Sequence, residues 1–235
     1  MASAKALLGK VFGSLVFRTG KVTRLTQLSP RYLSVRVEGE GLRGASYEPG
    51  DKVQAYIEDV GMRTYSPIDW DAAKGAFELV VFLHGASTPG VTWARGLGEG
   101  TTVSVLGPRR SLRATRAAPI VLFGDETSVG VVRALGLTSP GSLRVVLEAT
   151  DAPETSSVLH DAGIRAEVVA RAAGDAHVAA VVSALTRELQ ASPGAELLLT
   201  GAAPSIQAVQ RALKAQQIRP SATRAYWSPG KVGLD

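Results

Sequence analysis

The sequence predicts two structural halves: an antiparallel β-sheet or closed β-barrel, followed by a parallel α/β domain. Up to about residue 114, short segments rich in Val, Tyr, Phe and Thr are interrupted by Gly or Pro, as in all-β domains. Further along, continuous apolar segments alternate with stretches of helical periodicity. That alternation is typical of a parallel sheet covered by helices. We therefore divide the 235 residues into domains at 1–116 and 117–235.

In the first half, strands are predicted where β-branched and aromatic residues gather between Gly or Pro breaks. They are expected at residues 31–37, 52–57, 77–83 and 101–106, with a short helix at 90–98. The segment around Trp70 (IDWDAAKG) is interpreted as a loop between strands.

In the second half, apolar runs too short for helices predict buried strands. These are expected at 119–123, 143–148, 166–169, 196–200 and 223–227, with helices at 128–137, 154–160, 176–190 and 205–216. Ligands of an open α/β sheet bind at the carboxyl ends of its strands. We therefore look for functional residues directly after these strands.

Composition excludes several kinds of chemistry. The chain has no cysteine, so it has no disulfide, thiolate metal site or thiol nucleophile. Its three histidines, His84, His160 and His177, are far apart in the sequence, and we predict no metal centre. His160 and His177 are expected on the surface or on a helix face.

No apolar run is long enough to span a bilayer, and the first residues do not resemble a signal peptide. A cytoplasmic protein without stable membrane insertion is therefore expected.

Positive charge is concentrated in the first half. Residues 1–116 carry sixteen basic and ten acidic residues, whereas residues 117–235 carry ten basic and eleven acidic ones. Such a surface attracts a phosphate-bearing cofactor, an anionic substrate or nucleic acid. No nucleic-acid-binding motif is present, so we predict no nucleic-acid partner.

The segment Arg63-Thr64-Tyr65-Ser66 is the first candidate site. An arginine can bind a phosphate through two parallel hydrogen bonds, a tyrosine offers a flat face to a ring system, and a serine can reach a ring nitrogen. Arg63 and Tyr65 share one face if the segment is a strand. The alternative is an ordinary strand end with a surface arginine.

A second candidate is the turn that leads from the strand ending near Leu83 into the short helix. Its polar and small residues are His84, Gly85, Ala86, Thr88 and Thr92, followed by Trp93. Free N–H groups at a helix start favour a pyrophosphate. The alternative is simple capping of the helix.

Three further segments follow predicted strands. Gly107-Pro108-Arg109 ends the last strand of the first half, and Gly124-Asp125-Glu126-Thr127 follows the first strand of the second half. The two carboxylates of the latter would repel a pyrophosphate, and the segment lacks the Gly-x-Gly-x-x-Gly pattern of a dinucleotide loop. Tyr226-Trp227-Ser228-Pro229-Gly230 lies at the end of the final strand.

In this order and spacing, the six motifs (R-x-Y-S, V-x-L-H-G, the Pro/Gly turn with T-W-A, G-P-R, G-D-E-T and Y-W-x-x-G) resemble the siderophore-interacting proteins over residues 14–231. The resemblance implies a Greek-key FAD-binding barrel of the ferredoxin-reductase type and an α/β domain for NAD(P)H. It also implies reduction of the Fe(III) of a ferric siderophore inside the cell.

Site residues follow from the same resemblance. It implies that FAD is bound by Arg63, Thr64, Tyr65, Ser66, His84, Gly85, Ala86, Thr88, Thr92, Trp93 and Tyr226. Asp125, Glu126, Thr127 and Trp227 are expected beside the flavin and the nicotinamide as catalytic residues. Arg109, Arg110, Arg113 and Lys231 are candidates for a basic rim that binds the anionic ferric chelate.

The sequence departs from the family pattern at two places. Ile68 stands where the family usually has an arginine, and Thr200-Gly201-Ala202 stands where it has Ala-Gly-Glu. Nothing selects between Arg144 and Arg171 as ligands of an adenosine 2′-phosphate, so NADPH, NADH and a reduced ferredoxin all remain candidate electron donors.

Two alternative functions stay open. One is a flavoprotein reductase with another electron acceptor, and the other is a non-catalytic siderophore- or flavin-binding protein. A monomer is expected.

Overall fold

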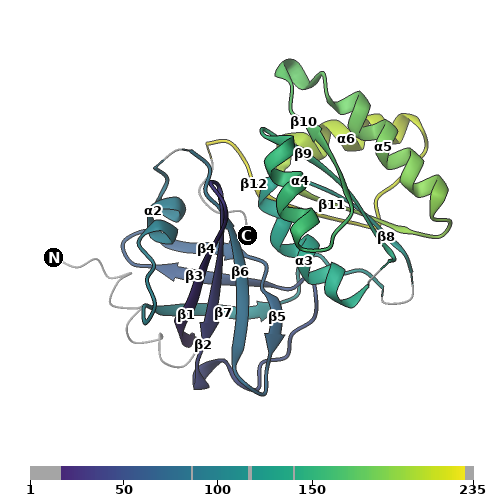
Figure 1. Ribbon diagram of the computed structural model, residues 1–235. Helices are drawn as coiled ribbons and strands as arrows, with labels where there is room; N and C mark the ends of the chain where they lie inside the picture. Colours follow the sequence, from purple (N-terminus) through teal and green to yellow (C-terminus); the bar gives the residue numbers. More distant parts are fainter. Residues whose placement is uncertain (1–16, 86, 116–117, 140, 231–235) are drawn as a thin grey trace.

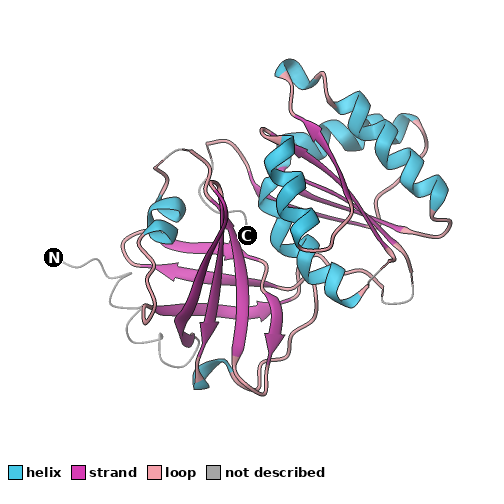
Figure 2. Cartoon of the chain, viewed as in Figure 1, coloured by secondary structure: helices cyan, strands magenta, loops and turns pink. Residues whose placement is uncertain are grey.

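The computed structural model describes residues 17–85, 87–115, 118–139 and 141–230. The first half is a seven-stranded antiparallel sheet, and the second is a five-stranded parallel sheet between helices (Figures 1 and 2). The fold class predicted from the sequence is therefore confirmed.

The first sheet has the strand order β4-β3-β7-β1-β2-β6-β5. Its elements are β1 (Arg18–Ser29), β2 (Tyr32–Glu38), the 3-10 helix η1 (Glu40–Leu42), β3 (Lys52–Ile57), β4 (Gly61–Tyr65), β5 (Ile68–Asp71), β6 (Ala76–Phe82), α2 (Pro89–Arg95) and β7 (Thr102–Arg109). The end strands β4 and β5 follow each other in the chain, so the sheet curves back on itself around one apolar core (Figure 1).

The loop predicted around Trp70 is wrong, because Ile68–Asp71 form strand β5. Ile68 and Trp70 are buried while Asp69 between them is exposed, which is the alternation of a half-buried strand. Trp70 stacks on Phe77 of the neighbouring strand, with ring centroids 4.6 Å apart. A four-residue strand with two aspartates is too short and too polar to stand out in the sequence.

The second sheet has the strand order β10-β9-β8-β11-β12, and all its described pairs are parallel. Its elements are β8 (Ile120–Gly124), η2 (Glu126–Ser128), α3 (Val129–Thr138), β9 (Leu143–Ala149), α4 (Ala152–Asp161), β10 (Ala166–Ala170), η3 (Ala173–Asp175), α5 (Val178–Ala191), β11 (Glu196–Ala202), α6 (Ala203–Ala215) and β12 (Ala222–Trp227).

Helices cover both faces of this parallel sheet (Figure 2). Alternate residues of β8 point to opposite faces. Leu122 packs in one core with α3 and α4, whereas Val121 and Phe123 pack in another with α5 and α6. Because both faces are buried, the strands read as continuous apolar runs, which is the pattern that predicted them.

The two halves share a core. Tyr32, Ile68 and Val80 of the first sheet pack with Val129 and Val132 of α3. β7 ends at Arg109 and β8 begins at Ile120, and the predicted boundary at residues 116 and 117 lies outside the described residues. The division into two domains stays a prediction. In the described ranges, no helix is long and apolar enough to cross a membrane.

Candidate functional site

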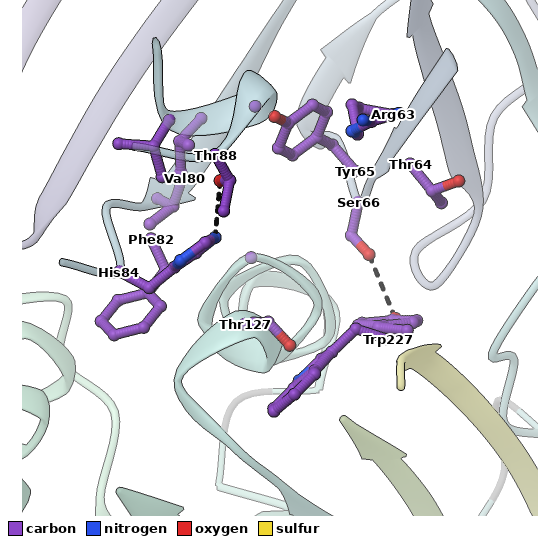
Figure 3. Close-up of a pocket in the computed structure, with 15 residues that line it drawn as sticks. Arg63, Thr64, Tyr65, Ser66, Val80, Phe82, His84, Thr88, Thr127 and Trp227 are labelled. Carbon is purple, nitrogen blue, oxygen red and sulfur yellow. Dashed lines mark hydrogen bonds between the residues drawn. The ribbon is translucent and has the colours of Figure 1, made fainter. Parts of the chain in front are cut away.

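A cavity of about 200 Å³ lies where the curved sheet meets the carboxyl edge of the parallel sheet. Residues from β4, β6, the turn after β6, α2, η2, α3 and β12 line it (Figure 3). They are Arg63, Thr64, Tyr65, Ser66, Val80, Val81, Phe82, His84, Thr88, Gly90, Val91, Thr127, Gly130, Tyr226 and Trp227.

Strand β4 and the residue after it supply one polar wall. All four residues of the Arg63–Ser66 motif line the cavity. The Arg63 guanidinium donates to the carbonyl of Met62 at 2.8 Å and has no carboxylate partner among the described residues. Tyr65 stacks on Trp93 at 5.7 Å, and burial raises the pKa of the Tyr65 hydroxyl to about 12. Arg63 therefore presents an unneutralised cation, and Tyr65 a fixed neutral ring.

Gly90, at the start of α2, faces this wall. A Cβ at Gly90 would lie 3.6 Å from the Tyr65 hydroxyl and 3.9 Å from the Arg63 side chain. A larger side chain there would enter the space between α2 and β4.

The turn before α2 contributes less than the sequence suggests. His84 and Thr88 line the cavity, and their side chains are hydrogen-bonded at 3.2 Å (Figure 3). Gly85 and Thr92 are exposed and do not line it. Trp93 lies behind Tyr65. Ala86 lies outside the described residues.

The C-terminal strand supplies the opposing wall. Tyr226 and Trp227 both line the cavity, as does Thr127 after β8. The hydroxyl of Tyr226 is 3.1 Å from that of Ser66, so a hydrogen bond joins β12 to the end of β4. Burial raises the pKa of Tyr226 above its ordinary value. The site is thus assembled from both halves of the chain.

The two carboxylates of the Gly-Asp-Glu-Thr segment do not line the cavity. Asp125 is buried and accepts hydrogen bonds from Thr127, from the Ala202 N–H and from the Trp227 indole. Burial raises the pKa of Asp125 above its ordinary value. These contacts place Asp125 behind Trp227, on the side away from the cavity.

Glu126 belongs to a separate buried ion cluster. Its carboxylate accepts from the Thr150 N–H at 2.6 Å and pairs with Arg171 at 2.9 Å. Burial opposes ionisation of Glu126, but these two donors outweigh it and lower the pKa of Glu126. Arg171 also contacts Glu148 at 3.2 Å. Arg171 is therefore neutralised by two carboxylates.

The prediction that His177 lies on the surface or on a helix face is wrong. His177 is buried, and its Nε2 lies 2.8 Å from the Glu148 carboxylate. The Ser205 hydroxyl donates to the same carboxylate at 2.6 Å. The Glu148 carboxylate is fully buried and therefore needs polar partners, which are His177 just before α5 and Ser205 of α6. His160 is exposed, as expected.

The candidate basic rim is dispersed. Arg109 and Arg110 are exposed at the end of β7 and do not line the cavity. Arg113 pairs with the buried Asp51 at 2.6 Å and with Glu48 at 3.1 Å. Lys231 lies outside the described residues. The structure brings none of the three described arginines into the cavity.

Six cavity residues were not predicted as site residues from the sequence: Val80, Val81, Phe82, Gly90, Val91 and Gly130. Val80 and Val81 form an apolar wall, but inside a strand they cannot be distinguished from ordinary core residues. An isolated glycine in a helical pattern, such as Gly130, does not by itself indicate a site. A Cβ at Gly130 would lie 3.2 Å from the Ser66 carbonyl oxygen.

Comparisons with known proteins agree with this geometry. Residues 51–112 match the family model of the siderophore-interacting FAD-binding domain. The chain is 26% identical over 155 residues to the mycobactin import ATP-binding/permease protein IrtA of Mycobacterium tuberculosis. That match covers 60% of this chain and only 18% of that relative's length.

Two solved structures share the fold of nearly the whole chain. The siderophore-interacting protein SipS from Aeromonas hydrophila is 15% identical, with a TM-score of 0.72 over 92% of this chain and 93% of that one. The ferredoxin reductase in carbazole 1,9a-dioxygenase is 17% identical, with a TM-score of 0.71 over 90% and 69%. Residues 51–112 are therefore similar to the siderophore-interacting FAD-binding domain, and nearly the whole chain has the fold of SipS and of this ferredoxin reductase.

Proposed function

We propose that this chain is a flavin-dependent reductase that passes electrons from NAD(P)H through FAD to the Fe(III) of a ferric siderophore in the cytoplasm. The observation that carries the proposal is the cavity between the two sheets. Its one wall comes from the segment that matches the FAD-binding family, and its other wall comes from the carboxyl edge of the α/β half. A cofactor held there would contact residues of both halves of the chain.

The cavity residues fit the flavin part of FAD. The walls combine apolar side chains such as Val80 and Phe82 with the hydroxyls of Thr64, Ser66 and Thr127. About 200 Å³ is less than the roughly 300–1,000 Å³ typical of a complete ligand pocket. The cavity therefore suits one ring system, and Arg63 and His84, which also line it, would hold other parts of the cofactor.

Each wall would act on the ring system in its own way. Tyr65 and Trp227 present aromatic faces for stacking. The Thr127 hydroxyl, which donates to Asp125, would accept a hydrogen bond from the ring system. Arg63 would neutralise a phosphate, since it has no carboxylate partner among the described residues. The chain's own residues thus orient the ring and exclude water from it.

FAD, when bound, supplies the conversion between a two-electron donor and a one-electron acceptor. One hydride from NAD(P)H carries the two electrons that reduce two Fe(III) ions to Fe(II). The positively charged first half would attract an anionic ferric chelate to the site. A hard oxygen chelator binds Fe(II) less tightly than Fe(III), so reduction favours release of the iron.

For the donor, we propose that NADH is accepted about as well as NADPH. Selective binding of the 2′-phosphate requires an available cation. Arg171 is paired with Glu126 and Glu148, and Arg144 donates to the Gly141 carbonyl and lies 3.7 Å from Glu188. Initial rates with the two dinucleotides test this, and at least a 100-fold preference for NADPH would contradict it.

Titration of the apoprotein with FAD, followed by flavin fluorescence, tests the cofactor site. Arg63→Ala is expected to weaken FAD binding by roughly 10- to 100-fold, because a charge-assisted hydrogen bond contributes about 1.5–3 kcal/mol. Arg219→Ala is the matched control, since Arg219 is exposed beyond α6. Equal FAD affinity in the Arg63 variant and the wild type would remove Arg63 from the site.

A further inference from the structure

The carboxylate of Asp125 joins three segments that are distant in the sequence. One oxygen, Oδ1, accepts from the Thr127 N–H at 2.9 Å and from the Thr127 hydroxyl at 2.5 Å. The other oxygen, Oδ2, accepts from the Ala202 N–H at 2.8 Å and from the indole Nε1 of Trp227 at 2.7 Å. Asp125 is only 1% exposed. The Ser128 hydroxyl also lies 3.5 Å from Oδ1. A buried carboxylate with these five donors is a satisfied acceptor and is not available as a general base.

The surrounding backbone leaves room for this carboxylate. Gly201 of β11 has a φ of +100°, and a Cβ at that position would lie 2.7 Å from the Asp125 carboxylate. The pairing of β11 with β12 also shifts register here, between Gly201 and Ala202. The backbone at the ends of β11 and β12 therefore leaves space for the Asp125 carboxylate.

The Trp227 side chain forms one hydrogen bond to the described residues, through its indole N–H. Its indole N–H donates to Asp125, while the ring lines the cavity and the residue is 39% exposed. In Figure 3, Trp227 and Tyr65 lie on different sides of the cavity. The preceding residue, Tyr226, is tied to Ser66 of the first sheet. The end of β12 is thus anchored to one half through Tyr226 and to the other through Trp227.

We propose that Asp125 is a positioning residue, which fixes the Trp227 indole as the cavity wall opposite Tyr65 and so sets the space for a planar ligand ring. Without the Nε1–H···Oδ2 hydrogen bond, a partly exposed indole is free to leave this orientation. The effect on catalysis rests on the proposed flavin function, whereas the effect on the indole does not.

The indole N–H of Trp227 gives a direct readout. The chain has three tryptophans, so a ¹H–¹⁵N spectrum contains three indole signals, and Trp227→Phe identifies the one from Trp227. We expect this N–H to exchange with solvent slowly in the wild-type protein and at least 10-fold faster in Asp125→Asn. Loss of one hydrogen bond with a charged group corresponds to about that factor or more.

Neighbouring groups supply the controls. Glu126→Gln removes the adjacent buried carboxylate, which does not contact Trp227, and should leave the exchange of the Trp227 N–H unchanged. The indole signals of Trp70 and Trp93 should keep their positions in Asp125→Asn, which shows that the first sheet remains folded. If Asp125→Asn does not fold, the wild-type exchange rate still decides, because a Trp227 N–H that exchanges like free indole overturns the proposal.

FAD binding provides the second readout. If Asp125 acts through Trp227, Asp125→Asn and Trp227→Phe are non-additive, and the double variant binds FAD no more weakly than the weaker single variant. Additive losses would overturn the positioning role. A wild-type protein that binds no FAD but protects the indole N–H would instead refute the proposed function and leave the contact intact.

Discussion

At the scale of single residues, the contacts of Asp125 in the Gly-Asp-Glu-Thr segment could not be predicted from the motif itself. The sequence places Asp125 directly after a buried strand, at the edge where ligands bind, and the resemblance to siderophore-interacting proteins implied a catalytic role for it. Its decisive partners lie 77 and 102 residues further along the chain. No local pattern indicates such contacts, so the sequence could locate the segment near the site but could not show that Asp125 lies behind the cavity wall.

The contact between Gly201 and Asp125 predicts a large effect of a small substitution. Gly201→Ala should lower the free energy of unfolding by about 3 kcal/mol or more, because it combines positive-φ strain with a collision against a buried carboxylate. Urea denaturation measures this change. Gly163→Ala is the control, since Gly163 has a φ of +72° and a Cβ at that position would have nothing within 4 Å. Equal losses in the two variants would show that the Asp125 contact contributes nothing.

At the scale of elements, strands and helices with strong patterns were predictable, and weakly patterned ones were not. β3 was predicted at its observed bounds, and the helices of the second half lie within a few residues of prediction. β5 was missed because its register depends on pairing with β6 rather than on its own four residues. The long β1 strand was also not predicted. Most of its residues are exposed or half-buried, and it carries no continuous apolar run.

Helix α3 connects fold and site, because its first turn forms part of the cavity. Gly130→Ala should reduce FAD affinity by roughly 3- to 10-fold, equivalent to about 1 kcal/mol. The reason is that a Cβ 3.2 Å from the Ser66 carbonyl oxygen pushes α3 away from the end of β4. FAD titration of the purified variant measures this change.

Gly136→Ala in the same helix is the control. A Cβ at Gly136 would meet only the side chains of Ile164 and Leu143, at 3.4 and 3.8 Å. We expect unchanged FAD affinity and, from helix propensity, a gain in stability of up to about 1 kcal/mol. The prediction for α3 is contradicted if both variants bind FAD as the wild type does.

At the scale of the whole molecule, contacts between the two halves keep the cavity walls together. Glu154 of α4 accepts from the Ser29 hydroxyl at 2.6 Å and from the Arg31 N–H and guanidinium at 2.9 and 2.6 Å. Beside it, the Tyr32 and Thr155 hydroxyls are hydrogen-bonded at 2.9 Å. Arg31 also lies over the ring of Phe82, a cavity residue. The hydrogen bonds of Glu154 and Thr155 with the first half join residues more than 120 positions apart and could not be predicted from local patterns.

Glu154 predicts a pH dependence of stability. Burial opposes its ionisation, but Ser29 and Arg31 outweigh that effect and lower the pKa of Glu154 in the folded protein. Its stabilising contribution is therefore complete above the unfolded pKa of about 4.3 and is lost as the pH falls through the lower folded pKa. Glu154→Gln should lower the free energy of unfolding by about 1–2 kcal/mol at pH 7 and by much less below about pH 3. Urea denaturation at the two pH values measures this change.

Glu167→Gln serves as the comparison, because Glu167 forms an exposed ion pair with Arg187. Such pairs contribute little, so this variant should be near wild type at both pH values. A Glu154 effect that does not change with pH would show that the carboxylate charge is not what joins the two halves.

The most direct test of the central claim is an anaerobic visible spectrum of the FAD-loaded protein during sequential additions. We predict that NADH or NADPH bleaches the flavin band, and that a ferric siderophore then restores it, with two Fe(II) formed for each reduced flavin. A flavin band that both dinucleotides leave unchanged, or a reduced band that ferric siderophores fail to restore, would contradict the account.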